Sequence, residues 1–267
     1  MQIKNKVFVV TGAGSGMGRE LTLLLVKKGA KVGMVDLNTK GMEETANLAG
    51  TGTTTLHSMN ISDRTVVEQL PELIERELGA VDALINNAGI IQPFNDVKDL
   101  NYETIERIMN VNFYGMLYMT KSFLPKLLDR PEASICNISS MGGFIPFPGQ
   151  TIYGASKAAV KLFTEGLYAE LKDTPVHCTV IHPGAINTNI MENSGVESST
   201  NNEEQKEAME KMALPADKAA QIIVKAIEQN KFRATVGKDA RFLDLFYRIS
   251  PKRAVDFIMK KMGNMNY

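Results

Sequence analysis

Residues 6–18 read KVFVVTGAGSGMG, an apolar run that leads directly into a glycine-rich turn. The β-branched and apolar side chains of residues 6–11 suit a strand that is buried on both faces. Residues 18–28 follow with leucines at helical spacing, and Gly29 provides a C-terminal stop. A strand, a glycine turn and a helix in this order predict the first unit of a parallel α/β sheet.

Strand-like and helix-like segments alternate along the rest of the chain. We expect strands at residues 31–36, 53–60, 83–86, 133–138, 177–182 and 232–236, and helices at 41–48, 64–78, 102–128, 152–171 and 215–229. Repeated strand–helix units with short connections imply right-handed crossovers and helices on both faces of the sheet. The sequence therefore predicts an α/β fold for residues 1–267, a single-domain, Rossmann-type, doubly wound parallel sheet of about seven strands.

Two segments depart from this alternation. Residues 190–212 are polar and follow the carboxyl end of a strand, where a flap over a substrate site would lie. Residues 238–267 are expected to be a helical extension, broken at Pro251, with apolar side chains between basic ones. The extension could contact an anionic membrane surface, or it could pack on its own domain or on a partner subunit.

Composition argues against several classes of protein. A formal net charge of zero gives no reason to expect a nucleic-acid partner. Cys136 and Cys178 lie in apolar runs and are expected to be small buried hydrophobes. Two cysteines and three scattered histidines supply no metal-binding spacing, so no metal is expected. No apolar run could form a transmembrane segment, and residues 1–12 lack a signal-peptide pattern, so we expect a cytoplasmic protein.

The glycine-rich turn and the second strand indicate a dinucleotide site. Glycines in residues 11–18 let the backbone approach a pyrophosphate, while the following helix offers free N–H groups. Asp36 ends the second strand, where a carboxylate accepts hydrogen bonds from the adenosine ribose and would repel a 2′-phosphate. Neither Ser15 nor Leu37 is basic, so the sequence favours NAD over NADP.

Tyr153 and Lys157 lie one helical turn apart in the sequence YGASK. The pKa of tyrosine is near ~10, which is too high for a base at neutral pH. A nearby ammonium would stabilise the phenolate and lower this pKa, and so would the cation of an oxidised nicotinamide. An isolated YxxxK pattern is more often an exposed helical pair, so the interpretation depends on further motifs.

Those motifs occur in order along two thirds of the chain. They are TGxxxGxG at residues 11–18, NNAG at 86–89, a helix asparagine at Asn112, a strand-end serine at Ser140, YxxxK at 153–157, and Pro-Gly at 183–184 with Thr188. Through them the chain resembles the short-chain dehydrogenase/reductase family. The resemblance implies an NAD-dependent oxidoreductase and a homodimer or homotetramer in which helices 102–128 and 152–171 pair across interfaces.

The resemblance also implies catalytic roles for four residues. Ser140 would hydrogen-bond the substrate oxygen and stabilise its developing charge. Tyr153 would exchange a proton with that oxygen as the general acid/base. Lys157 would tune Tyr153 and bind the nicotinamide ribose, and Asn112 would hold a water that connects Lys157 to solvent. Ser139 is expected to be structural because it lies on the opposite face of its strand. His182 is also expected to be structural, since Tyr153 is available as the acid/base.

The cofactor site implied by the resemblance draws on six parts of the chain. It comprises Gly12, Ser15, Gly16, Met17, Gly18, Asp36, Leu37, Asn60, Ile61, Asn87, Ala88, Gly89, Tyr153, Lys157, Pro183, Gly184, Ile186 and Thr188. Asn87 and Gly89 would lie beside the adenosine ribose, while Thr188 and the backbone around Ile186 would hold the carboxamide. Asn60 departs from the family pattern, which commonly has Asp there, and we expect altered adenine affinity at most.

The substrate pocket is expected to use residues 141–151, 92–94 and 190–212. Residues 141–148 read MGGFIPFP, which favours a hydrophobic substrate, although Phe144 and Phe147 could instead pack in the core or at a subunit contact. The leading hypothesis is hydride transfer between NAD(H) and a hydrophobic secondary alcohol or ketone. Alternatives are an NADPH-dependent 3-oxoacyl thioester reductase, which conflicts with Asp36, and a non-catalytic dinucleotide-binding redox sensor.

Overall fold

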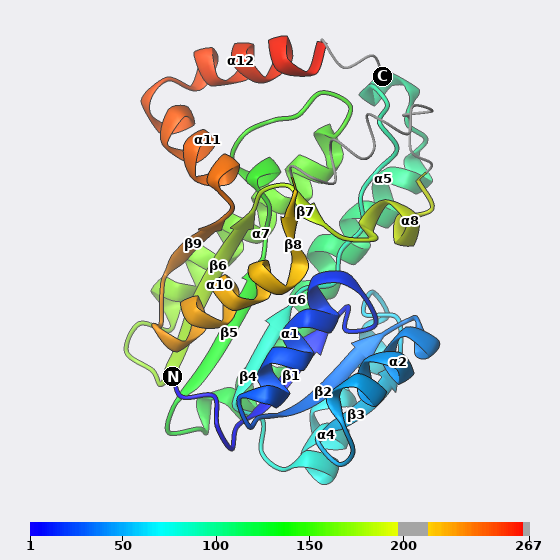
Figure 1. The fold of residues 1–267 in the computed structure, drawn as a ribbon, viewed down its shortest axis with the longest axis vertical. Coiled ribbons are helices and arrows are strands. Elements are labelled where there is room, and N and C mark those ends of the chain that lie inside the picture. Colours follow the sequence, from blue (N-terminus) through cyan, green and yellow to red (C-terminus); the bar gives the residue numbers. More distant parts are fainter. Residues whose placement is uncertain (197–212, 264–267) are drawn as a thin grey trace.

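A seven-stranded parallel sheet forms the centre of the molecule in the computed structural model, which describes residues 1–196 and 213–263. Its strands are β1 (Val7–Thr11), β2 (Lys31–Asp36), β3 (Thr54–Ser58), β4 (Ala83–Asn86), β5 (Ala133–Ile138), β6 (Val176–Pro183) and β9 (Arg233–Val236). Their order is β3-β2-β1-β4-β5-β6-β9. The doubly wound α/β fold and its seven strands are therefore confirmed (Figure 1).

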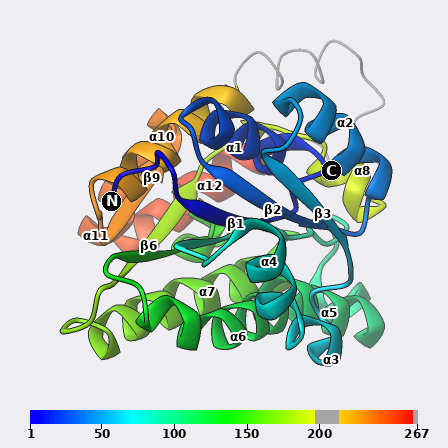
Figure 2. The same cartoon turned by 90° about the horizontal axis from the view of Figure 1, so that it is seen from below.

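Helices cover both faces of this sheet (Figure 2). One face carries α1 (Gly16–Lys27), α2 (Thr39–Ala49) and α10 (Ala216–Glu228). The other carries α3 (Arg64–Val67), α4 (Leu70–Leu78), α5 (Tyr102–Met109), α6 (Met116–Leu128) and α7 (Thr151–Glu170). The strand order reverses between β1 and β4, so a crevice is expected outside the carboxyl ends of these two strands.

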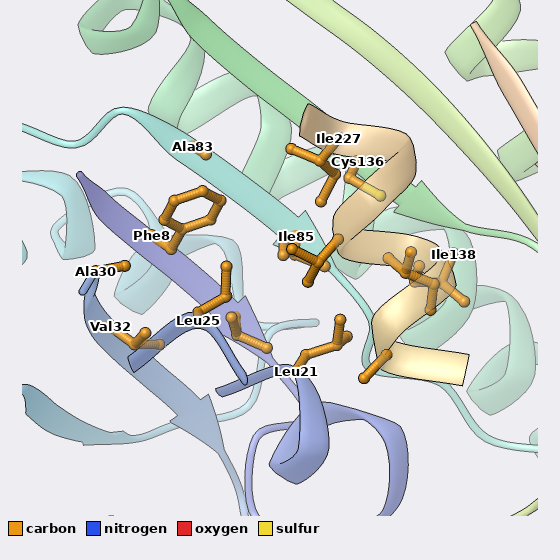
Figure 3. Packing of buried hydrophobic residues seen from close by; sticks show 14 of the residues in the cluster. Phe8, Leu21, Leu25, Ala30, Val32, Ala83, Ile85, Cys136, Ile138 and Ile227 are labelled. Atoms are coloured by element: carbon orange, nitrogen blue, oxygen red, sulfur yellow. The ribbon is translucent and has the colours of Figure 1, made fainter. Parts of the chain in front are cut away.

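Alternation along the strands divides the core into two layers. Phe8 and Val10 of β1 pack with α1 and α10 residues such as Leu25 (Figure 3). Val7 and Val9 point to the opposite face and pack with α4, α6 and α7 residues such as Phe123. The inner strands β1, β4, β5 and β6 are buried on both faces and mainly apolar, which is why their positions could be read from the sequence. The edge strands β3 and β9 are more polar and more exposed.

Two expected helices are interrupted. The helix expected over residues 64–78 is split into α3 and α4, and Pro71 falls in the first turn of α4. Proline has no N–H to donate, so it is tolerated where a helix begins but not in its interior. The helix expected over residues 102–128 contains a wide π-helical turn, η2 (Asn110–Gly115), between α5 and α6.

The end of the chain adds two helices beyond β9. They are α11 (Lys238–Ile249) and α12 (Pro251–Gly263), which lie at the upper end of the molecule in Figure 1. A short pair of strands, β7 (Ile186–Asn187) and β8 (Leu214–Pro215), flanks α8 (Ile190–Ser194). Most of the expected flap, residues 197–212, lies outside the described residues. No helix in the described part of the chain could cross a bilayer.

Candidate active site

The turn after β1 brings backbone unusually close to neighbouring groups. Gly12 has φ +69°, and an added Cβ there would lie 2.9 Å from Nδ2 of Asn87. A Cβ on Gly18 would overlap the carbonyl oxygen of Gly12. Glycine is therefore favoured at 12 by both backbone conformation and packing, and at 18 by packing. Helix α1 begins at Gly16, so its free N–H groups lie at the turn.

The NNAG segment is joined to this turn by hydrogen bonds. The Asn87 side chain donates to the backbone oxygen of Thr11 at 3.0 Å. The Thr11 hydroxyl accepts from the backbone N–H groups of Asn87 and Ala88, each at 3.0 Å. The carboxyl ends of β1 and β4 are therefore held together at the point where the strand order reverses.

Asp36 lies beside the same turn. Its two carboxylate oxygens accept hydrogen bonds from the backbone N–H groups of Gly14 at 2.8 Å and of Asn38 at 2.9 Å. A carboxylate oxygen has a second lone pair, so each retains capacity for a ribose hydroxyl. These two hydrogen bonds hold the Asp36 carboxylate in position at the end of β2.

A cleft of about 650 Å³ opens along this edge of the sheet. The predicted cofactor residues that line it are Gly12, Ser15, Gly16, Met17, Asp36, Leu37, Asn60, Ile61, Asn87, Ala88, Gly89 and Thr188. The predicted residues outside its lining are Gly18, Tyr153, Lys157, Pro183, Gly184 and Ile186. Glycine backbone, a helix N-terminus and a strand-end carboxylate are the groups that bind a dinucleotide, so the residues present fit such a cofactor.

The charge of the cleft bears on the choice of cofactor. Asp36, Glu103 and Glu106 line it, and Arg107 is the cation among the lining residues that the structure describes. Arg19, one turn into α1, donates to Glu44 and to the backbone oxygen of Gly14, each at 2.8 Å. An additional phosphate would therefore meet more negative than positive charge.

Ser140, Tyr153 and Lys157 come together beyond the ends of β5 and β6. The Ser140 hydroxyl is hydrogen-bonded to the Tyr153 phenol and accepts from the Gly142 backbone N–H at 3.0 Å. The Lys157 ammonium donates to the backbone oxygen of Ile138 at 3.0 Å and lies 6.0 Å from the centroid of the Tyr153 ring. Ser139 points away, and its hydroxyl donates to the Lys157 carbonyl.

Burial changes the acidity of both titratable groups. It raises the pKa of the Tyr153 phenol, and the hydrogen bond from Ser140 opposes this only in part. It lowers the pKa of Lys157 to about 8. The sequence predicted a lowered pKa for Tyr153; in the structure, desolvation of the phenolate outweighs the Ser140 hydrogen bond and raises this pKa.

Lys157 reaches the wall of the cleft at Gly89. A Cβ on Gly89 would lie 2.9 Å from the Lys157 ammonium nitrogen and 3.3 Å from Oδ1 of Asn112. The Asn112 amide bonds both backbone groups of Ile90 and donates to the Ser156 hydroxyl. Asn112 therefore links the end of NNAG to α7, and its water-holding role stays a prediction.

Residues 183–194 pass over the glycine turn. Thr188 lies against Gly16, and an added Cβ on that glycine would be 3.2 Å from the Thr188 Cβ. The Asn193 side chain donates to the Ser15 hydroxyl at 2.8 Å. The Ser194 hydroxyl accepts from the Ile91 backbone N–H at 3.0 Å. Asn193 and Ser194 were expected only as part of the flap at residues 190–212, and their contacts were not predicted because neither belongs to a motif.

Gln92 supports the beginning of α7 from outside this helix. It is fully buried, and its amide oxygen accepts from the backbone N–H groups of Ile152 and Tyr153, both at 2.9 Å. Its amide nitrogen donates to the Gly149 carbonyl at 2.8 Å. The sequence placed Gln92 in the substrate pocket; in the structure its side chain instead caps the beginning of α7, where Gln150 supplies no side-chain cap of its own.

A family model and a related protein sequence both point to the same family of oxidoreductases. The model of the short chain dehydrogenase family matches residues 6–199. A Mycobacterium tuberculosis protein that carries the name of an oxidoreductase, SadH, is 36% identical over 252 residues, which cover 92% of this chain and 91% of that protein.

Solved structures agree with this in fold. A short chain dehydrogenase from Burkholderia cenocepacia in complex with NADP superimposes with a TM-score of 0.79 at 25% identity, covering 97% of this chain and 99% of that one. The 3-ketoacyl-(acyl-carrier-protein) reductase from Brucella melitensis, complexed with NADH, gives a TM-score of 0.77 at 26% identity, covering 88% and 96%. Similar structures thus hold either nicotinamide cofactor.

Proposed function

Because the chain belongs to the short-chain dehydrogenase family, we propose that it transfers a hydride between NAD(H) and a secondary alcohol or ketone, with Tyr153 as general acid/base. The observation that supports this most directly is the cluster of Ser140, Tyr153 and Lys157 next to a cleft whose lining suits a dinucleotide. A protein that only sensed the cofactor would need the cleft but not this cluster.

The proposed chemistry divides between the cofactor and the side chains. When bound, the nicotinamide ring supplies the hydride acceptor or donor. Ser140 holds the substrate oxygen through its hydroxyl, beside the phenol to which it is already hydrogen-bonded. Tyr153 takes the alcohol proton during oxidation and returns it during reduction. Lys157 supplies positive charge near the phenolate and, at the wall of the cleft, a donor for the nicotinamide ribose.

Acidity sets the expected pH dependence of this reaction. The raised pKa of Tyr153 leaves the phenol protonated at neutral pH, which suits ketone reduction. Alcohol oxidation needs the phenolate, so its kcat/KM should rise with pH, while kcat/KM for reduction should fall. The pKa of Lys157, about 8, keeps this residue mostly charged at neutral pH.

The direct test is NADH formation, followed by absorbance, across a panel of secondary alcohols. Tyr153→Phe removes the exchangeable proton but keeps the ring, so kcat should fall roughly a thousandfold, within the usual range for acid–base catalysis. Binding of NAD, measured by calorimetry, should be unchanged in this variant. Equal turnover by Tyr153→Phe and by the unsubstituted protein would contradict the assignment.

We propose NAD as the cofactor on the basis of charge. Three carboxylates against one guanidinium line the cleft, and Asp36 lies where a 2′-phosphate would approach the ribose site. We expect kcat/KM to favour NAD over NADP by roughly a hundredfold, as expected for loss of a few kcal/mol of binding. Asp36→Ser should reduce this preference, and preference for NADP by the unsubstituted protein would refute the proposal.

A hydrophobic substrate remains part of the proposal. Met141, Phe144 and Phe147 are partly buried and pack with the cluster of Ile145 and Leu243, so the alternative of core packing holds for part of their surface. The surface of these three side chains that stays exposed lies close to Ser140 in the chain, where a hydrophobic substrate could contact it. Faster turnover of short polar alcohols than of long-chain or cyclic ones would argue against a hydrophobic substrate.

A 3-oxoacyl thioester reductase is the second candidate. The Brucella reductase, whose fold matches, favours it, and that structure holds NADH rather than NADPH. Assay of a 3-oxoacyl thioester beside simple ketones would distinguish the two. We retain, as further parts of the proposal, a cytoplasmic location and a homodimer or homotetramer formed through α5, η2, α6 and α7. The exposed side chains of these elements include Tyr114 of η2 and Leu162 of α7.

A further inference from the structure

Helices α11 and α12 have one face turned toward the domain. Leu243 of α11 and Ala254 and Ile258 of α12 are buried in a small cluster with Ile145. Met141, Phe144 and Phe147 pack against this cluster. The inner face of the two helices therefore covers the segment that follows Ser140. This agrees with the alternative in which the C-terminal extension packs on its own domain.

Polar contacts hold α11 in a defined position. The Asp239 carboxylate accepts from the Ala185 backbone N–H at 2.8 Å. Asp244 and Arg233 form two parallel hydrogen bonds of 2.8 and 3.0 Å, and both side chains are largely buried. Bidentate pairs of this kind fix orientation as well as distance. The outer face of α11 is thus presented by a rigid support.

That outer face exposes large apolar side chains. Phe242, Leu245 and Ile249 are 54%, 62% and 74% exposed and lie on one side of α11 at helical spacing. Phe257 of α12 is 41% exposed, and its ring centroid lies 6.0 Å from that of Phe242. The two helices therefore share one continuous apolar surface, which we call the outer apolar surface.

Basic side chains surround the outer apolar surface. The exposed cations are Lys238, Arg241, Arg248, Lys252, Arg253, Lys260 and Lys261. Asp256 is the exposed acid in the described part of these helices, and Asp239 and Asp244 are taken up by the contacts described above. A chain with a formal net charge of zero thus concentrates positive charge at one end.

We propose that the outer apolar surface and its basic rim bind an anionic lipid membrane. Lysine and arginine would contact lipid phosphates while Phe242, Leu245 and Ile249 enter the interfacial region, the pattern of an interfacial amphipathic helix. A second copy fits less well, because a two-fold interface would bring this positive surface against itself. A nucleic acid would satisfy the cations but leave the apolar side chains in water.

The position of the outer apolar surface beside the site would also affect substrate access, an inference that rests on the proposed function. The inner face of the same helices packs against Met141, Phe144 and Phe147, which follow Ser140. Membrane binding would bring the substrate side of the site next to the lipid, where a hydrophobic alcohol or ketone is concentrated. The binding itself does not depend on catalysis, so it is tested without substrate.

The test is cosedimentation of the full-length protein with vesicles. We expect binding to vesicles of equal parts phosphatidylcholine and phosphatidylglycerol to exceed binding to pure phosphatidylcholine by roughly tenfold or more, and to weaken with salt. The triple variant Phe242→Gln/Leu245→Gln/Ile249→Gln and the charge variant Arg241→Glu/Lys252→Glu/Arg253→Glu should each lose most of this binding. Truncation is avoided, because it would remove the Asp239 contact.

The controls place one substitution of each kind on a distant helix. Leu48→Gln alters an α2 side chain that is 65% exposed, and Lys40→Glu reverses an exposed charge on the same helix. Both should bind vesicles as the unsubstituted protein does, and circular dichroism should show all variants folded. Equal binding to both vesicle types, or none, would overturn the proposal. So would dissociation of an oligomer by the triple variant, seen by light scattering, since the surface would then be an interface between copies.

Discussion

The Gln92 amide shows how one side chain can join segments that are distant in sequence. Its contacts with Gly149, Ile152 and Tyr153 span 57 to 61 residues. The Gln150 side chain returns a hydrogen bond of 2.8 Å to the Gln92 backbone oxygen. Both amides are buried, so the loss of any of these hydrogen bonds would leave a buried polar group without a partner and out of reach of water. Gln92 thereby sets the backbone position of Tyr153 at the start of α7.

Replacing Gln92 should impair turnover more than cofactor binding. Gln92→Leu leaves the N–H groups of Ile152 and Tyr153 without acceptors, which should lower the free energy of unfolding by about 2 kcal/mol. Displacement of Tyr153 should lower kcat tenfold or more, because the reaction rate is sensitive to small shifts of the reacting groups. The KM for NAD should change little, because Gln92 is outside the cleft lining.

Gln92→Glu is the matched variant for this prediction. It keeps an oxygen acceptor at the beginning of α7 and loses only the donor to Gly149. A carboxylate is also favoured near a helix N-terminus. We therefore expect Gln92→Glu to recover part of the kcat lost in Gln92→Leu. If the leucine variant is destabilised but keeps full kcat, Gln92 supports the fold and does not position Tyr153.

The residues of the site differ in how well the sequence identifies them. Asp36 and the glycines around Gly12 could be found because their function depends on neighbours within one strand–turn–helix unit. Gln92 and Asn193 fell within segments expected at the substrate pocket, but their contacts could not be predicted, because an amide makes useful contacts in many surroundings and its partners are set by the tertiary fold. The direction of the Tyr153 pKa was wrong for the same reason, since burial is a property of the fold.

Helix α11 is joined to the loop after β6 by one close contact. Gly184 packs so tightly against Asp239 that an added Cβ would overlap both carboxylate oxygens. The same carboxylate accepts the Ala185 N–H. Glycine is therefore favoured at 184 by packing, since a larger residue would displace the Asp239 carboxylate, whereas Gly12 is favoured by its positive φ.

A double-mutant cycle should reveal this contact. Gly184→Ala alone should lower the free energy of unfolding by about 2 kcal/mol through overpacking. Asp239→Ala alone should lower it by about 1 kcal/mol through loss of the hydrogen bond. In the double variant the overlap is gone, so the combined loss should be smaller than the sum of the two. Urea denaturation measures all three, and strictly additive losses would show that the contact does not constrain α11.

Elements were predicted best where local pattern and tertiary packing agree. Strand β2 matches its expected bounds because its apolar run is buried on both faces. The η2 turn was missed, since a π-helical turn carries the same residues as the helix around it. Its wide turn places Gly115 against Ile61, where an added Cβ would lie 2.7 Å from the isoleucine side chain. That contact comes from another segment and leaves no local signal.

At the scale of the whole molecule, one buried histidine makes stability depend on pH. His182 is fully buried at the end of β6, and its Nδ1 donates to the Ser140 carbonyl at 3.1 Å. Its Nε2 has no hydrogen-bond partner among the described residues. Burial lowers the pKa of His182 to about 4, and the charge of Arg233 acts in the same direction. The folded protein therefore keeps this ring neutral in mild acid.

The consequence is a loss of global stability between pH 6.5 and 4. In this range the unfolded chain binds a proton on His182 that the folded protein does not, so the free energy of unfolding falls as the pH falls. A shift of this size corresponds to at most about 3 kcal/mol. His182→Asn keeps a donor for the Ser140 carbonyl but cannot titrate, so its stability should decrease less over the same interval. Burial also lowers the pKa of His57, but that contribution is present in both proteins and cancels in the difference. Urea denaturation of both proteins at pH 7 and pH 4.5 measures this, and parallel losses would show that His182 is not the residue responsible.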